Sequence, residues 1–207
     1  DEIRCGSTAV AGPVQVVEPR EVPLGGPRAM TVRRTLPTHD RTMVGAWCFA
    51  DHYGGPGDRA DGASMDLPPH PHTGLQTVTW LFAGTVEHRD SIGSVQAVRP
   101  GELNLMTSGG GICHSEVATS AEPLHGAQLW VALPESARHG ARDFEHYVTQ
   151  PVSLDGGELR VFIGELAGQQ SPARTYTPLL GAELTIEPGA ELALAVDTDF
   201  EHGVLVD

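Results

Sequence analysis

The chain of 207 residues carries 27 acidic side chains against 13 basic ones, all of them arginine, so its formal net charge is −14. A surface this acidic does not attract a polyanion, which argues against direct nucleic-acid binding. The longest apolar runs, such as Leu192–Val196, are far shorter than the roughly 20 residues that a membrane span needs, while the 40% hydrophobic content predicts a folded core.

Turn residues interrupt the chain at short intervals, as in Gly54–Gly57, Gly109–Gly111 and Gly156-Gly157. Between them, β-branched, aromatic and polar residues alternate with the period of a strand. Many short strands with this punctuation predict an all-β protein built from antiparallel sheets. In chain order, we expect strands over residues 75–82, 126–133, 159–164, 182–187, 191–197 and 202–206.

One segment between these strands has a helical pattern. Pro134 precedes a charged stretch, Glu135–Tyr147, which is polar enough for a helix at the surface. We therefore expect a first β unit over residues 1–133, a linker with a short helix over 134–150, and a second β unit over 151–207. The second unit has only 207 − 150 = 57 residues, which is too few for a complete barrel, so we expect either a truncated chain or a partial second unit.

Three cysteines, Cys5, Cys48 and Cys113, are an odd number and contain no Cys-x-x-Cys pair. This usage argues against a disulfide framework and predicts a reducing, cytoplasmic location. No basic segment followed by an apolar stretch opens the chain, so we expect no secretory signal.

Two short polar motifs carry most of the chemical information. In His70-Pro71-His72 and in His114-Ser115-Glu116, the outer residues are two positions apart, so on a strand they face the same side. The motifs are 114 − 72 = 42 residues apart, which leaves room for three strands and their turns. If the two strands lie side by side, three imidazoles and one carboxylate converge. This ligand set suits Fe, Mn, Ni, Cu or Zn better than Ca or Mg, and the lack of thiolates argues against a structural zinc site.

A plainer interpretation exists for the first half of this pattern. Two histidines in a proline-rich stretch, taken alone, are more often exposed to solvent than bound to a metal. The second motif changes this balance, because an inward-facing glutamate in a small barrel would otherwise be an unpaired buried charge. The two motifs together therefore favour a metal site.

Around these motifs the sequence resembles the pirin family. The similarity extends over about residues 15–165, and the remainder of the chain fits only loosely. Gly110 departs from the family pattern, because pirins usually carry a basic residue there, near the mouth of the site. The stretches that carry the resemblance are Val22–Gly26, Asp51–Tyr53, His70–Phe82, Glu87–Ser91, Pro100–Thr107 and Ile112–Glu116.

Pirins are bicupins, with two tandem antiparallel β-barrels of the jelly-roll type and a non-haem iron in the N-terminal barrel. The resemblance therefore implies a metal-bearing cupin over residues 1–133 and an incomplete cupin-like domain over 151–207. It implies Fe(II) as the metal, with Mn, Ni, Cu or Zn as alternatives. The implied ligands are His70, His72, His114 and Glu116.

The same resemblance implies two different functions. Some pirins resemble quercetin 2,3-dioxygenases, which open flavonols with O₂, and in that case Glu116 would be the catalytic residue that accepts a proton from the substrate hydroxyl. Others resemble redox-sensing regulators, which bind a protein partner in one oxidation state of the iron without catalysis. We expect the dioxygenase, with a small flavonol-like aromatic substrate and O₂ as its partners and with no nucleic acid or membrane bound.

Other candidate residues have plain structural explanations. His88 lies in a hairpin strand between charged neighbours and is expected to be structural or exposed. Asp51 and His52 could form a catalytic pair, but the glycine- and proline-rich sequence after them indicates a surface loop, where we expect them. Glu165 has no histidine near it in the sequence, and we therefore expect no second metal site in the C-terminal unit.

Overall fold

The computed structural model describes residues 14–24, 30–55 and 65–207. In this part of the chain every regular element is a strand and every strand pairing is antiparallel, which confirms the all-β prediction. The same residues contain no helix that is long and apolar enough to cross a membrane. Two features of the sequence, Cys5 and Gly25-Gly26, lie outside the described residues.

The largest sheet has seven strands and forms one wall of the first β unit. Its order is β1-β2-β3-β10-β5-β8-β11, so strands far apart in the sequence become neighbours. The central strands β5 and β10 confirm the strands predicted over 75–82 and 126–133. The strands of this sheet are β1 (Arg20–Leu24), β2 (Met30–Leu36), β3 (Trp47–Tyr53), β5 (Leu75–Ala83), β8 (Glu102–Thr107), β10 (His125–Ala132) and β11 (Asp143–Val148).

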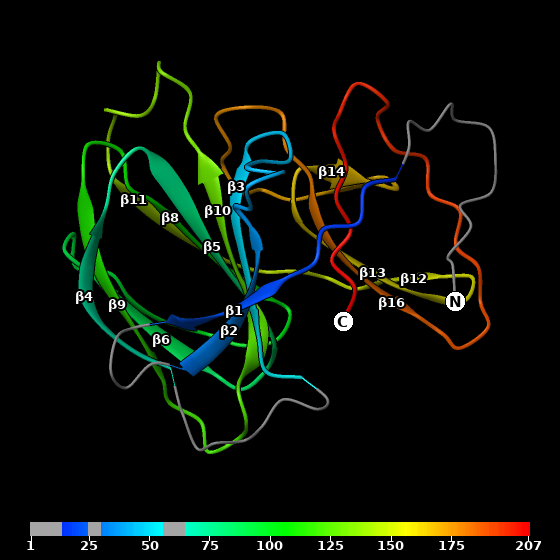
Figure 1. Cartoon of the computed structure of the whole chain (residues 1–207), viewed down its shortest axis with the longest axis horizontal. Helices are drawn as coiled ribbons and strands as arrows, with labels where there is room; N and C mark the ends of the chain where they lie inside the picture. Colours follow the sequence, from blue (N-terminus) through cyan, green and yellow to red (C-terminus); the bar gives the residue numbers. More distant parts are fainter. Residues whose placement is uncertain (1–13, 25–29, 56–64) are drawn as a thin grey trace.

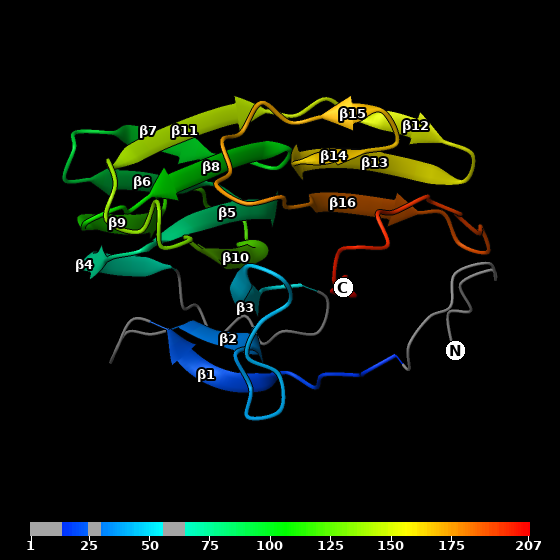
Figure 2. The same ribbon diagram turned by 90° about the horizontal axis from the view of Figure 1, so that it is seen from above.

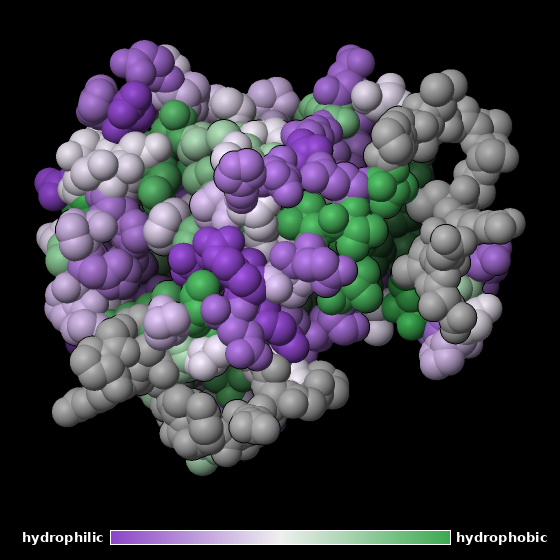
Figure 3. Space-filling model, viewed as in Figure 1, coloured by the Kyte–Doolittle hydropathy of each residue, from purple (hydrophilic) through white to green (hydrophobic). Residues whose placement is uncertain are grey.

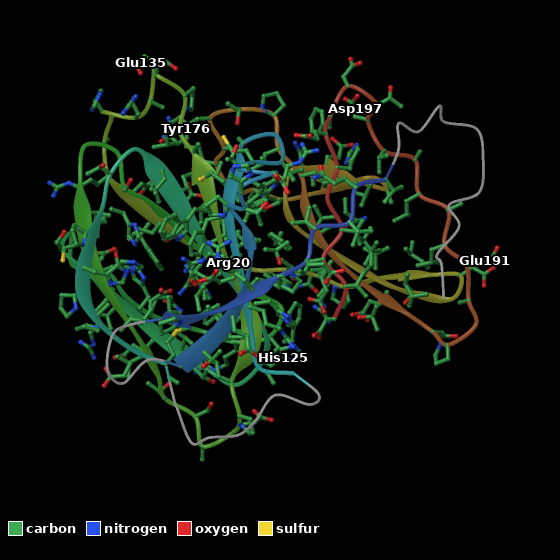
Figure 4. The ribbon with its side chains drawn as sticks, viewed as in Figure 1. Arg20, His125, Glu135, Tyr176, Glu191 and Asp197 are labelled. Carbon is green, nitrogen blue, oxygen red and sulfur yellow. The ribbon has the colours of Figure 1, made fainter. Side chains whose placement is uncertain are left out.

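A four-stranded sheet faces the seven-stranded one (Figure 1). Its order is β4-β9-β6-β7, and side chains from both sheets fill the space between them (Figure 4). Because β9 lies next to β4, residues 70–72 and 114–116 come together in one sheet. The strands are β4 (Asp66–His72), β6 (Val86–Asp90), β7 (Val95–Val98) and β9 (Ile112–Ala118).

The second β unit lies beside the first (Figure 2). It consists of a three-stranded sheet, β12-β13-β16, and a ribbon of β14 and β15. β13 and β16 confirm the strands predicted over 159–164 and 182–187. The face of this unit that Figure 3 shows carries an apolar area. The strands are β12 (Val152–Leu154), β13 (Gly157–Ile163), β14 (Glu165–Leu166), β15 (Gln169–Gln170) and β16 (Gly181–Ile186).

Side-chain alternation along β5 separates two environments. Val78 and Trp80 face the second unit and pack in one apolar cluster with Phe162 of β13. The intervening Thr79 faces the opposite way, into the space between the two sheets of the first unit, where it contacts Glu116. An apolar cluster therefore lies between the units, with polar contacts beside it such as the hydrogen bond from Trp80 to Glu183, whereas the interior of the first unit is partly polar.

The helix predicted over 135–147 is wrong. Hydrogen bonds from Ala137 N and Arg138 N to Pro134 O form a single turn, and Gly140 ends it. Residues 143–148 form β11, which pairs with β8. Phe144 stacks on His88, whereas Tyr147 packs against the apolar cluster of Trp80 and Phe162. The division of the chain into 1–133, 134–150 and 151–207 stays a prediction.

The strands predicted over 191–197 and 202–206 are also wrong. Residues 187–207 contain no strand, and β16 pairs only with β13 among the described residues. A strand is stable only beside a partner that completes its ladder of hydrogen bonds, and alternation in the sequence cannot reveal whether such a partner exists. Contacts of another kind hold this segment, since Glu201 pairs with Arg41 and accepts a hydrogen bond from Gly45 N at 2.9 Å.

Trp80 joins the two β units, so its loss is expected to destabilise the whole chain. Its ring stacks on Phe162 with 4.6 Å between centroids, and Nε1 donates a hydrogen bond to Glu183 Oε2 at 2.8 Å. We expect Trp80→Ala to lower the free energy of unfolding by about 3–5 kcal/mol, as measured by urea denaturation. Val148→Ala, at an exposed position of β11, is the control. Equal midpoints for the two variants would contradict a joining role for Trp80.

Candidate metal centre

The antiparallel pairing of β4 with β9 brings the two polar motifs together. His70 is directly opposite His114, and His72 is opposite Ile112. A register shift between Leu67 and His70 sets this alignment. Because residues two apart face the same side of a strand, the three imidazoles point to one side of the sheet, as the spacing predicts. His72 and His114 are buried, and His70 is half-buried.

The three imidazoles form a compact triangle. The ring centroids are 4.5 Å apart for His70 and His114, and 4.9 Å apart for each of the two pairs that include His72. One nitrogen of each ring lies within 4.8 Å of the others, so a single metal ion could be held between them. Imidazole nitrogens are typical ligands of divalent transition metals, which fits this donor set.

Burial keeps His72 and His114 in the neutral form that binds metals. Desolvation, together with the neighbouring His70, lowers the pKa of His72 to about 4. Desolvation and the three surrounding imidazoles lower the pKa of His114 to about 2. At neutral pH both rings therefore carry one proton and one free lone pair.

The contacts of His70 and His114 indicate which of their nitrogens are available to a metal. His70 Nδ1 is 2.9 Å from Pro68 O, and because a carbonyl only accepts, Nδ1 carries the proton and Nε2 keeps its lone pair. His114 Nε2 is buried without a hydrogen-bond partner in the described part of the chain. A buried nitrogen with no partner is costly, and a bound cation would satisfy it.

Glu116, the fourth expected ligand, lies slightly apart from this triangle. It is buried on β9, and Thr79 Oγ1 donates a hydrogen bond to its Oε1 at 2.8 Å. It groups with His88 and His114, whereas His70 and His72 belong to the first group with His114. Burial raises the pKa of Glu116, and the Thr79 hydroxyl and the nearby imidazoles of His88 and His70 oppose that rise only in part. His114 is therefore the residue that connects the two groups.

His88 is a member of the site that the sequence did not identify. It is only 2% exposed, so the exposed position considered for it is wrong. The pairing of β6 with β9 places it opposite Glu116, and its Nδ1 is 3.2 Å from His114 Nδ1. Its ring stacks on Phe144 with 4.5 Å between centroids. The His-x-Asp spacing places His88 and Asp90 on the same face of a hairpin strand. The sequence does not show that this face points towards Glu116, because that depends on the pairing of β6 with β9.

A third group of possible ligands lies on the other side of the first unit. Asp51 and His52 belong to β3 and are buried, so the surface loop predicted for them is wrong. Arg34 forms two hydrogen bonds of 2.7 Å with the carboxylate of Asp51. His52 Nε2 lies 3.2 Å from His125 Nε2 and 3.2 Å from Asp207 Oδ1 (His125 is labelled in Figure 4).

Proton positions distinguish this third group from the triangle. Arg33 Nη2 lies 2.7 Å from His52 Nδ1, and a guanidinium only donates. His52 Nδ1 must therefore accept, and in the neutral ring the proton is on Nε2, the nitrogen that faces His125 and Asp207. A protonated nitrogen cannot bind a metal, so this group acts as a hydrogen-bonded network rather than a metal site.

The interior around the triangle combines aromatic and polar side chains. The ring of Trp130, in β10, lies edge-on to His72 with 5.0 Å between ring centroids, and it stacks on Phe49 with 3.9 Å between centroids. Asn104 and Gln128 each keep one buried polar atom without a hydrogen-bond partner among the described residues. Such groups could orient an aromatic molecule that carries oxygen atoms.

Gly110, the departure from the family pattern, lies at the surface of the first unit. It borders a surface hollow of about 640 Å³ that no histidine lines. Arg142, directly before β11, also lines the hollow. The lining residues are Ile92, Gly110, Gly111, Gly140, Ala141 and Arg142.

Comparisons with known proteins agree with this geometry. Residues 29–131 match the family model described as Pirin. A Pseudomonas aeruginosa protein named "Putative quercetin 2,3-dioxygenase" is 45% identical over 194 residues, which cover 93% of this chain and 61% of that protein. Human pirin is 33% identical over 164 residues, which cover 77% of this chain and 54% of human pirin. The crystal structure of quercetin 2,3-dioxygenase from Acinetobacter baumannii has a TM-score of 0.73 at 43% identity, covering 82% of this chain and 56% of that one.

The chain spans about three-fifths of the length of the curated relatives that it matches in Pseudomonas aeruginosa and Caulobacter vibrioides. The part that matches the family model contains β4, β6 and β9, and with them all the histidines of the triangle, His88 and Glu116. The sequence motifs, the paired sheets and these relatives agree, and the chain belongs to the pirin family.

Proposed function

We propose that this chain forms the metal-binding unit of a dioxygenase that opens flavonols such as quercetin with O₂. His70, His72, His114 and Glu116 would hold an Fe(II) ion. The observation that carries the proposal is the triangle of three imidazoles, in which the buried Nε2 of His114 has no protein partner within the described residues. The names of the relatives support the choice of reaction.

The donor set fits a redox-active transition ion. Three imidazoles and a carboxylate leave two positions of an octahedral ion open, which suits non-haem iron better than a closed structural site. When bound, iron would supply Lewis acidity towards a substrate hydroxyl and redox chemistry with O₂. Other divalent ions share much of this ligand preference, so the identity of the metal is part of the proposal.

The side chains around the triangle would bind and orient the substrate. Trp130 lies beside His72, and its indole, which Phe49 covers on one face, would contact the planar rings of a flavonol. The unpartnered amide atoms of Asn104 and Gln128 would pair with its oxygen substituents. The surrounding walls would exclude water and hold the substrate in one orientation.

Glu116 would accept the proton of the substrate hydroxyl. Its Oε1 is held by Thr79, which leaves Oε2 for the incoming proton. Burial raises the pKa of Glu116, and a carboxylate with a raised pKa is a stronger base than an exposed one. The hydrogen bond from Thr79 limits this rise and fixes the carboxylate in place.

We also propose that the protein works in a reducing compartment, in agreement with the cytoplasmic location expected from its cysteine usage. Cys48 and Cys113 are both free thiols in the described part of the chain. Neither lies among the proposed ligands, so their oxidation state does not enter the metal chemistry.

Removal of the central ligand is expected to abolish both metal binding and catalysis. His114→Ala should weaken Fe(II) binding by more than roughly 100-fold, beyond the range seen when only a hydrogen-bond partner of a ligand is lost. Metal content would be measured after anaerobic loading, and quercetin consumption and O₂ uptake would follow in air. His39→Ala, at a fully exposed side chain, is the control and should keep both properties. A wild-type chain that binds iron but leaves quercetin intact would contradict the dioxygenase and favour the regulatory role.

The depressed pKa values predict how the stability of the metal-free chain depends on pH. His72 and His114 stay neutral in the folded chain below pH 6.5, whereas both take up protons in the unfolded chain. The contribution of these two histidines to the free energy of unfolding should therefore be fully present above pH 6.5. It should fall as the pH drops towards 4, by about 1.4 kcal/mol per pH unit for each histidine. Denaturant unfolding at a series of pH values would measure this slope.

The matched pair for that experiment is His72→Gln and His39→Gln. His72→Gln removes one of the two titrating groups and should make the slope shallower. His39 is hydrated in both states, so His39→Gln should keep the wild-type slope. A wild-type chain whose stability does not change between pH 6.5 and 4 would show that the imidazoles are not held neutral by the fold.

A further inference from the structure

His88 forms the middle of a chain of buried polar groups that begins at His114 and ends at Asp90. Its Nδ1 lies 3.2 Å from His114 Nδ1, and its Nε2 lies 3.2 Å from Asp90 Oδ2. The side chains of His88 and Asp90 are 2% and 0% exposed. Phe144 stacks on the His88 ring and so limits its rotation. Water therefore has little access to any of these contacts.

The other oxygen of Asp90 is already occupied. Asp90 Oδ1 accepts hydrogen bonds from Ile92 N at 3.0 Å and Ser94 N at 2.9 Å in the turn between β6 and β7. Both donors are backbone groups whose positions are fixed by the turn. The carboxylate is thus oriented so that Oδ2, a pure acceptor, faces His88 Nε2.

This arrangement determines where the protons lie. An ionised carboxylate requires a donor, so His88 carries its proton on Nε2 and presents a lone pair at Nδ1. That lone pair accepts from His114 Nδ1, which must then carry the proton of His114. The lone pair of His114 is consequently on Nε2, the buried atom that lacks a partner in the described structure. The opposite assignment would set a lone pair of His88 against the carboxylate.

We propose that Asp90 and His88 are a positioning pair that holds the proton of His114 on Nδ1 and thereby keeps Nε2 available for the metal. This inference rests on the proposed metal site and adds two residues that act through His114. Hydrogen bonds to the second nitrogen of a ligating histidine fix its tautomer and ring orientation, and their loss typically lowers metal affinity by about 10–100-fold. Here two residues in series replace the single carboxylate or carbonyl that usually does this.

Asp90→Asn is the most direct test, because the turn dictates how the amide must lie. The two backbone N–H groups require the amide oxygen, so the NH₂ group has to face His88 Nε2. His88 would then carry its proton on Nδ1, and His114 Nδ1 would have to accept a hydrogen bond from it. The proton of His114 would move to Nε2, the proposed ligand atom.

The first measurement is the tautomer of His114 in the metal-free chain, by long-range ¹H–¹⁵N NMR at neutral pH. We expect the proton on Nδ1 in the wild type and on Nε2 in Asp90→Asn. Glu87→Gln, the same change at a half-buried neighbour in β6, is the matched control and should keep the wild-type tautomer. A wild-type His114 that carries its proton on Nε2 would overturn the proposal without any variant. Wild-type tautomers in Asp90→Asn would overturn it too.

The second measurement is the affinity for Zn²⁺, which has no redox chemistry, by competition with a chromophoric chelator. We expect Asp90→Asn and His88→Leu to bind about 10–100-fold more weakly than the wild type. His88→Gln can still offer a carbonyl acceptor to His114 Nδ1 and should recover part of the loss, and Glu87→Gln should match the wild type.

Equal losses in His88→Gln and His88→Leu would identify His88 as a direct ligand and overturn the positioning role. Full wild-type affinity in Asp90→Asn would also overturn it. The two proposals remain distinguishable, because a wild-type chain that binds no metal refutes the proposed function, whereas the tautomers in the metal-free chain still decide the role of Asp90 and His88.

Discussion

The register between β4 and β9 is the constraint on which the site depends. It sets His70 opposite His114, and the alternation of side chains then sends His72 and Glu116 to the same side of the sheet. A slip of one residue would turn His114 and Glu116 to the opposite face. The shift between Leu67 and His70 absorbs the irregularity of the proline-rich strand before the histidines begin, so that the remaining pairs stay aligned.

The site combines groups whose burial is unfavourable without a metal. Burial lowers the pKa of His72 and His114 and raises that of Glu116, so each group resists the charge it would take in water. A divalent cation would offset the cost of burying all of these groups, because it binds the imidazole lone pairs and neutralises the carboxylate. The polar interior therefore makes sense as part of a binding site, whereas an apolar interior would be more stable in a purely structural barrel.

Much of the fold and part of the site could be predicted from the sequence. The His-x-His and His-x-Glu spacings follow from the two-residue period of a strand, and β5 and β10 are strongly alternating. His88 could not be assigned, because its importance depends on the pairing of β6 with β9, a long-range contact that no local pattern encodes. The errors at residues 187–207 and 143–148 have the same cause. Residues 187–207 alternate but have no partner strand among the described residues, whereas residues 143–148 form a strand because they pair with β8, far away in the sequence.

The second nitrogen of each imidazole decides which histidines can bind a metal. The triangle around His114 and the group around His52 have similar residue types and similar separations. Yet His70 Nδ1 faces a carbonyl, which leaves Nε2 with a lone pair, whereas His52 Nδ1 faces a guanidinium, which forces the proton onto Nε2. Distances between possible ligands are therefore insufficient to identify a metal site in this fold. The hydrogen bonds behind the ligands separate the two groups, because each bond fixes the nitrogen that holds the proton.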